Sequence, residues 1–190
     1  MGITHFNFAQ MTKRTLFTAA FLMTTVAMSV INYIDHRKSS ATRSKLLQIS
    51  EGVFITSQLQ PNSLPYLKRR GIRTVVDIRP DGEEAEQPPS TEIEDAAKAE
   101  AVSFYYIPVP HETIPDSAVE SLSAALKDSR LPTVLYCRTG RRAVRLFALA
   151  EATRIDGPSA YSIKLMVEKT GFNADDLQET IAKRINLRAK

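Results

Sequence analysis

The chain has 190 residues, of which 43% are hydrophobic and 24% charged, so it suits one globular domain with some additional apolar sequence. Its formal net charge of +4 is dispersed and accompanies no nucleic-acid-binding motif, so we expect no nucleic-acid partner. A single cysteine excludes a fold stabilised by internal disulfides.

Residues 15–34 form an apolar stretch that contains no charged residue. As a helix this stretch would be about 30 Å long, which matches the hydrocarbon core of a bilayer. Basic residues flank it on both sides, and Tyr33 lies where interfacial aromatic residues are common. The sequence therefore predicts an N-terminal tail of residues 1–14 followed by a transmembrane anchor over residues 15–34. A cleaved signal peptide, with its cleavage site at residues 27–29, is the alternative.

The rest of the chain is predicted to comprise a linker and one folded domain. Residues 35–48 are polar and rich in serine, as a tether would be, and the domain is placed over residues 49–187. Runs of β-branched and aromatic residues predict strands over residues 53–56, 74–78, 104–107 and 133–136. Helices are predicted over residues 62–70, 91–101, from 116 onward, 142–153, 161–169 and 174–185, with Asn62, Thr91 and Asp116 as N-caps.

Strands and helices alternate along this domain. Such alternation predicts an α/β fold with a mainly parallel sheet flanked by helices. Functional sites in sheets of this kind lie at the carboxyl ends of the strands. Cys137 directly follows the strand predicted over residues 133–136, so we expect it at such an end.

The loop after Cys137 has the composition of an anion-binding site. Gly140 lets the backbone curl tightly, so that several N–H groups can point at one centre, and the following helix adds the positive end of its dipole. These features favour a reactive thiolate at Cys137. Arg142 can form two parallel hydrogen bonds with a phosphate or a sulfur oxyanion. The candidate substrate-binding residues are Arg138, Thr139, Gly140 and Arg141. The alternative is a buried structural cysteine followed by a solvated helix start.

A family resemblance covers about residues 49–185. It is carried by five blocks in the same order, residues 49–58, 71–83, 87–90, 106–109 and 137–142. The chain is similar to the phosphatase-like domain of bacterial beta-lactamase-hydrolase-like proteins, within the cysteine-dependent group that includes protein-tyrosine-phosphatase-like and rhodanese-like domains. The resemblance implies a single protein-tyrosine-phosphatase-like domain, preceded here by the predicted transmembrane helix. It also implies that Cys137 is the nucleophile and Arg142 the anion-binding arginine.

Three positions depart from the pattern of standard tyrosine phosphatases. Four residues separate Cys137 from Arg142 where five are usual, and the shorter loop is rhodanese-like. Ala143 stands where those phosphatases carry a Ser or Thr that donates to the thiolate, and Tyr136 replaces their usual His. The departures bear on how efficiently a phosphocysteine intermediate would break down.

A general acid is expected on the loop of residues 108–116. Placing this loop on the family pattern brings His111 to the acid position, and an imidazole exchanges protons readily near neutral pH. An exposed loop histidine without a catalytic role is the alternative. Glu112 and Asp116 compete for the same role, although Asp116 is also predicted to cap a helix.

Two further candidates follow the strand predicted over residues 74–78. Asp81 could approach the same rim and bind substrate, and its alternative interpretation is a turn residue. Arg79 could bind substrate or pair with the acidic loop that extends to Pro89.

Three functions are compatible with this sequence. The first is a membrane-anchored phosphatase that hydrolyses a phosphomonoester through a phosphocysteine intermediate. The second is a rhodanese-type sulfurtransferase in which Cys137 carries a persulfide, and the third is a non-catalytic module that binds phosphorylated ligands. In each case the partner is an anionic compound, and no metal ion or cofactor is expected. The excess of Lys and Arg after the apolar stretch favours a cytoplasmic domain on the bacterial inner membrane.

Overall fold

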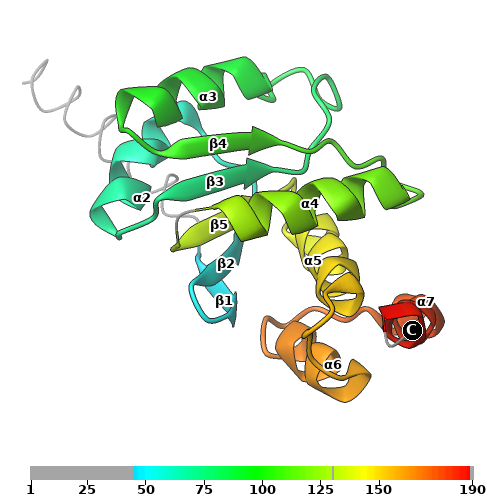
Figure 1. The fold of residues 1–190 in the computed structure, drawn as a ribbon. Coiled ribbons are helices and arrows are strands. Elements are labelled where there is room, and N and C mark those ends of the chain that lie inside the picture. Colours follow the sequence, from blue (N-terminus) through cyan, green and yellow to red (C-terminus); the bar gives the residue numbers. More distant parts are fainter. Residues whose placement is uncertain (1–44, 130, 189–190) are drawn as a thin grey trace, which may run out of the picture. The chain divides into compact units, whose positions relative to one another are not determined.

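The computed structural model describes residues 45–129 and 131–188 (Figure 1). The predicted tail and transmembrane anchor, residues 1–14 and 15–34, lie outside the described residues, as does most of the predicted linker. No helix of the described part of the chain combines the length and the apolar character that a membrane crossing requires.

A five-stranded sheet with the order β1-β2-β5-β3-β4 forms the centre of the domain. All neighbouring strands run parallel except β1, which is antiparallel to β2. This arrangement confirms the predicted α/β fold with a mainly parallel sheet. The strands are β1 (Leu47–Ser50), β2 (Val53–Thr56), β3 (Thr74–Asp77), β4 (Ser103–Tyr106) and β5 (Thr133–Tyr136).

Strand β1 is the element that the sequence analysis missed. It begins at Leu47, inside the predicted linker of residues 35–48, so the fold starts before residue 49, where the sequence places its beginning. Only Ile49 of this strand is fully buried, and polar Gln48 and Ser50 alternate with the apolar residues. So short and half-polar a pattern is hard to distinguish from a tether.

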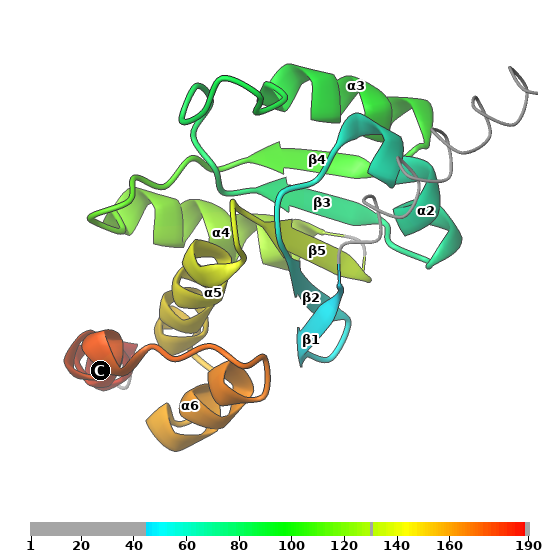
Figure 2. The same cartoon turned by 180° about the vertical axis from the view of Figure 1, so that it is seen from behind.

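Helices cover both faces of the sheet (Figures 1 and 2). Val75 and Val134 belong to one apolar cluster with α2 and α3, whereas Val76 and Leu135 belong to another with α4 and α5. Neighbouring residues of a strand thus serve opposite faces, as the pleat of a strand requires. The helical elements are η1 (Pro61–Ser63), α2 (Leu64–Arg69), α3 (Ser90–Ala99), α4 (Asp116–Asp128), α5 (Arg141–Thr153), α6 (Ala160–Glu168), η2 (Asp175–Leu177) and α7 (Gln178–Arg188).

The three predicted N-caps are wrong, although the helices exist. Helix α3 begins at Ser90 with Pro89 as its N-cap, so Thr91 lies inside the first turn. Helix α4 likewise has Pro115 as its N-cap, and Asp116 is its first residue. Asn62 lies within η1. A proline directly before a helix start holds an extended conformation, and in these two helices the N-cap residue itself contributes no capping side chain.

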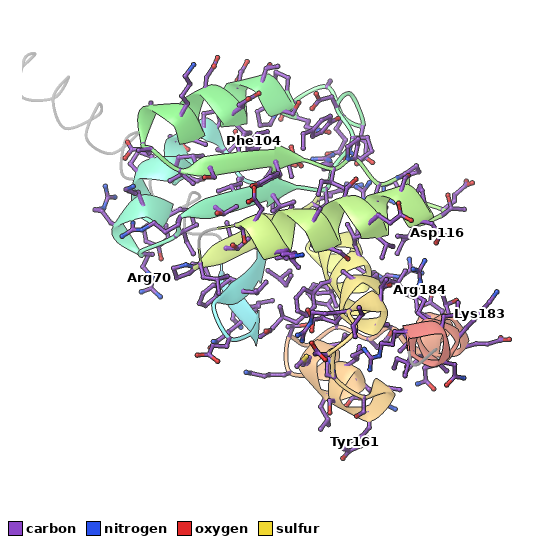
Figure 3. All side chains as sticks on the ribbon, in the orientation of Figure 1. Arg70, Phe104, Asp116, Tyr161, Lys183 and Arg184 are labelled. Carbon is purple, nitrogen blue, oxygen red and sulfur yellow. The ribbon has the colours of Figure 1, made fainter. Side chains whose placement is uncertain are left out.

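The C-terminal helices hold α5 in place, and both views show α6 and α7 beside it (Figures 1 and 2). Arg184 of α7 donates from Nη1 to Thr153 Oγ1 at 3.1 Å and forms an ion pair with Asp116 of α4 (Figure 3). Arg188 donates to the carbonyl oxygens of Glu151 and Arg154 near the end of α5. These bonds satisfy carbonyls that a helix leaves without partners, and they fix the helix that follows Cys137.

Candidate active site

Cys137 lies at the carboxyl end of the central strand β5, as the sequence predicts. Its side chain is 1% exposed, and its Sγ accepts a hydrogen bond from the Gly140 N–H at 3.2 Å. Helix α5 begins at Arg141, directly after this loop, so the positive end of its dipole is close to the sulfur. The backbone therefore places positive partial charge beside the sulfur, at the Gly140 N–H and at the start of α5.

Gly140 is required by the shape of this loop. Its φ of +97° lies in a region that residues with a side chain rarely adopt. A Cβ atom there would lie 3.1 Å from Ile55 Cγ2 and 3.3 Å from the Thr56 carbonyl oxygen. The loop is thus pressed against β2, and this close approach aims the Gly140 N–H at the sulfur.

Arg142 has one end of its guanidinium group fixed by protein. Nη1 donates to Glu83 Oε1 at 2.6 Å and to the Val109 carbonyl oxygen at 2.7 Å, and Nη2 donates to Glu83 Oε2 at 2.7 Å. Arginine has five N–H donors, so these bonds leave Nε and the second hydrogen of Nη2. Those two donors form one edge, which can bind two oxygens of a single anion.

The charge of Arg142 is secured by its surroundings. Burial lowers the pKa of Arg142, but the hydrogen bond to Glu83 and the attraction to Cys137 outweigh it and raise that pKa above its usual value. The hydrogen bond from Arg142 in turn lowers the pKa of Glu83 to about 2, against burial and with support from Arg79. Both groups are therefore charged at neutral pH.

Glu83 and its neighbour Glu84 link the loop after β3 to the loop after β5. Glu83 Oε2 also accepts from Arg79 Nε at 2.9 Å, and Glu84 pairs with Arg79 at 3.1 Å and with Arg138 at 2.7 Å. Arg79 is 2% exposed and donates to Gln58 Oε1 at 2.8 Å. Arg79 thus pairs with the acidic loop, one of the two roles that the sequence left open. The role of Glu83 was missed, because its partner is remote in sequence.

His111 lies beside the cysteine loop. Its side chain is 64% exposed, and its Nε2 lies 3.8 Å from Glu83 Oε1. It lines one pocket of about 410 Å³ together with Arg138, Thr139, Arg141, Arg142 and Arg145. The structure therefore brings the predicted acid position and the predicted substrate-binding loop together.

The other acid candidates lie in different surroundings. Asp116 forms an ion pair with Arg184, and Glu112 is not among the described residues that line the pocket beside His111. Asp81, predicted as a substrate-binding residue, accepts hydrogen bonds from the Ser90 N–H and Oγ, each at 2.7 Å. Because both of its carboxylate oxygens serve the start of α3, Asp81 has the structural turn role that the sequence analysis gave as its alternative. It does not line the pocket that the described residues form beside His111.

The site thus combines a thiol under backbone donors, an arginine with one free edge and a nearby imidazole. Within residues 45–129 and 131–188, no cluster of three or more His, Cys, Asp or Glu side chains could hold a metal ion. Residues 45–154 match the family model described as "Beta-lactamase hydrolase-like protein, phosphatase-like domain". The chain belongs to this family. The resemblance predicted from five sequence blocks is confirmed.

Curated relatives of this phosphatase-like domain are longer proteins. A beta-lactamase hydrolase-like protein of Agrobacterium fabrum is 32% identical over 113 residues, which are 60% of this chain and 26% of that protein. One from Xylella fastidiosa is 30% identical over the same coverage. The match therefore spans about a quarter of each relative's length.

Solved structures of phosphatases share the fold. A candidate phosphatase from Neisseria meningitidis is 27% identical, with a TM-score of 0.63 over 73% of this chain and 96% of that chain. The core catalytic domain of a PP-IP phosphatase from S. cerevisiae, solved with citrate, is 17% identical, with a TM-score of 0.54 over 76% of this chain and 91% of that one. The described domain therefore has the fold of protein-tyrosine-phosphatase-like enzymes.

A buried acid lies beneath the site of this phosphatase-like domain. Asp77 is 2% exposed at the end of β3 and accepts from the Arg79 N–H at 2.9 Å. Burial raises the pKa of Asp77 to about 6, although the Tyr136 hydroxyl and the Arg79 N–H both oppose the shift. Tyr136 lies opposite Asp77 in the β3–β5 register, directly before Cys137. Ionisation of this carboxyl group therefore costs folding free energy next to the active site.

We predict that Asp77→Asn stabilises the protein above pH 6. The folded-state pKa of Asp77, about 6, exceeds its unfolded value of 3.8. The stability that the neutral carboxyl group contributes is therefore full below pH 3.8 and is lost as the pH rises through about 6. The variant should gain up to about 3 kcal/mol at pH 7 and nothing below pH of about 4. Urea unfolding at pH 4, 5, 6 and 7 measures this, with exposed Asp95→Asn as the control. A gain that does not depend on pH would contradict the prediction.

Proposed function

We propose that this protein is a cysteine-dependent phosphatase that hydrolyses a phosphomonoester through a phosphocysteine intermediate. One observation carries the proposal: Cys137 Sγ lies under the Gly140 N–H, and it interacts with an arginine whose far end is held by Glu83 and Val109. A thiolate and two forward-facing guanidinium donors suit a tetrahedral oxyanion. Membership of a phosphatase-like family supports the same chemistry.

In the first step the Cys137 thiolate attacks phosphorus, and the bond from phosphorus to the leaving oxygen breaks. The loop N–H groups and the free edge of Arg142 stabilise the negative charge on the other three oxygens. His111 gives its proton to the leaving oxygen. In the second step His111 takes a proton from water as the water oxygen attacks phosphorus; the phosphorus–sulfur bond breaks, inorganic phosphate leaves and the Cys137 thiolate is restored.

Glu83 connects the two ends of this mechanism. Its carboxylate holds Arg142 and lies 3.8 Å from His111 Nε2. The same group therefore orients the proposed anion-binding arginine and lies beside the proposed acid.

A rhodanese-type sulfurtransferase is the second candidate, and the short loop favours it. Four residues separate Cys137 from Arg142, and Ala143 is buried in the core with no hydroxyl group to offer the sulfur. In this reaction the Cys137 thiolate would attack the outer sulfur of thiosulfate and release sulfite. Cyanide would then take that sulfur from the persulfide as thiocyanate and leave the thiolate. A module that binds phosphorylated ligands without turnover is the third candidate.

The test is to assay the purified full-length chain with para-nitrophenyl phosphate and, separately, with thiosulfate plus cyanide. We expect phosphate release that falls at least about a hundredfold in Cys137→Ser, since the nucleophile is lost. In Arg142→Lys the rate of phosphate release should also fall about a hundredfold, because lysine cannot bind two oxygens in parallel. Arg154→Lys, far from the loop, is the matched control. Thiocyanate without phosphate release would establish the sulfurtransferase, and phosphate release that survives in Cys137→Ser would contradict the covalent mechanism.

His111→Ala should affect substrates according to their leaving groups. Proton donation matters most when the leaving oxygen is strongly basic, so we expect about a hundredfold loss on an alkyl phosphate and a small loss on para-nitrophenyl phosphate. The neighbouring variant Glu112→Ala should leave both rates unchanged. Equal losses on the two substrates, measured as kcat, would remove His111 from the role of general acid.

Membrane attachment through residues 15–34 stays a prediction, since this stretch lies outside the described residues. We propose a single span with the domain on the cytoplasmic side of a bacterial inner membrane. The full chain should stay with the membrane after an alkaline carbonate wash, and the domain should resist added protease in intact spheroplasts until the cells are opened. Release by the wash, or cleavage of the domain in intact spheroplasts, would contradict this placement.

A further inference from the structure

The pocket beside Cys137 has an unusual lining. Its volume of about 410 Å³ exceeds what a single phosphate group needs and falls in the range of small-molecule sites. Every lining residue is polar or charged, and four of them are arginines: Arg138, Arg141, Arg142 and Arg145. The only ring among its lining side chains is the imidazole of His111, and none of the described Phe, Tyr, Leu, Ile or Val side chains lines it.

The arginines extend along the start of α5, away from Cys137. Arg145 follows Arg141 by four residues and Arg142 by three, so the three side chains are neighbours on one side of the helix. Arg142 serves the phosphate at the sulfur through its free edge. Arg141 and Arg145 therefore lie where a second group of the same ligand would reach.

Two of the outer arginines are already held by carboxylates, and one is free. Arg138 pairs with Glu84, and Arg145 pairs with Asp176 before α7. Among the described residues, the exposed Arg141 has no ion-pair or hydrogen-bond partner for its guanidinium group. Arg145 is only 16% exposed, and its Nε is buried without a partner in the described part of the chain. The pocket thus retains unused donors beyond Arg142.

The charges around the pocket are also unequal in number. Five arginines lie in or beside it, and three carboxylates pair with them: the arginines are Arg79, Arg138, Arg141, Arg142 and Arg145, and the carboxylates are Glu83, Glu84 and Asp176. The cations outnumber the anions, and the excess lies at the pocket. A ligand with one phosphate would satisfy Arg142 and leave Arg141 without a partner.

We infer that this pocket binds a small phosphate compound with a second phosphate group, and that Arg141, supported by Arg145, is the specificity-determining residue for it. The inference rests on the proposed phosphatase function and names its substrate class. The first phosphate lies at Cys137 and Arg142, and the second lies beside it at Arg141 and Arg145. A phosphotyrosine peptide is the disfavoured alternative, because its single phosphate group would leave Arg141 without a partner.

Phosphate, pyrophosphate and tripolyphosphate are suitable probes, measured as inhibitors of para-nitrophenyl phosphate hydrolysis by the full chain. Pyrophosphate should bind at least about tenfold more tightly than phosphate, as one additional charge-assisted contact predicts. Arg141→Gln should reduce this ratio to about two or less, whereas Arg154→Gln should leave it unchanged. Arg141 is exposed, so its replacement should not disturb folding.

Several outcomes would overturn the inference. If the unmodified chain binds pyrophosphate and phosphate with nearly equal affinity, no second subsite exists. The same follows if Arg141→Gln weakens the binding of both anions equally. Faster turnover of a phosphotyrosine peptide than of a sugar bisphosphate would also contradict it. If no phosphatase activity is found, titration calorimetry of the same anions with full-length Cys137→Ser tests the subsite separately from the proposed reaction.

Discussion

The ion pair between Arg142 and Glu83 is the interaction on which the site depends. Arg142 is buried, and a buried guanidinium without a partner is strongly unfavourable, so the hydrogen bonds to Glu83 and Val109 offset the cost of burying its charge. The pair also fixes orientation, because two parallel hydrogen bonds allow one geometry. What stays free is the edge toward Cys137. The partners that the buried charge requires thus leave two guanidinium donors beside the sulfur, which suits the proposed binding of an anion there.

The strand order explains why these partners meet. Strands β3 and β5 are neighbours in the sheet, with Asp77 opposite Tyr136, so the acidic loop after β3 and the basic loop after β5 leave the same edge together. Glu83 and Glu84 on the first loop then face Arg142 and Arg138 on the second. Parallel neighbours direct their carboxyl ends to one place, which is why chemistry gathers there. The fold itself brings together residues that are far apart in the sequence.

Features that depend on neighbouring residues in the sequence could be predicted, whereas contacts between residues far apart in the sequence could not. The buried strands, the cysteine loop and the family follow from local patterns, such as the β-branched run before Cys137 and the glycine after it. The partner of Arg142 does not, because any acidic residue of a long loop could have served and only the β3–β5 pairing selects Glu83. Asp81 illustrates the converse: its position after a strand suggested substrate binding, yet its carboxylate serves Ser90. Capping motifs failed for a related reason, since Pro89 and Pro115 set those helix starts through the backbone.

Loop length matters less for the proposed chemistry than the spacing of Cys137 and Arg142 suggests. If the loop alone placed the arginine, one residue fewer would move its guanidinium group away from a phosphate. Here the far end of Arg142 is anchored by Glu83 from the loop after β3 and by Val109 from the segment after β4. The guanidinium position is therefore set from outside the loop, and Gly140 supplies the backbone donor to the sulfur within it. The loop has one residue fewer but keeps both groups that we propose bind the anion, so it is compatible with the proposed phosphoryl transfer.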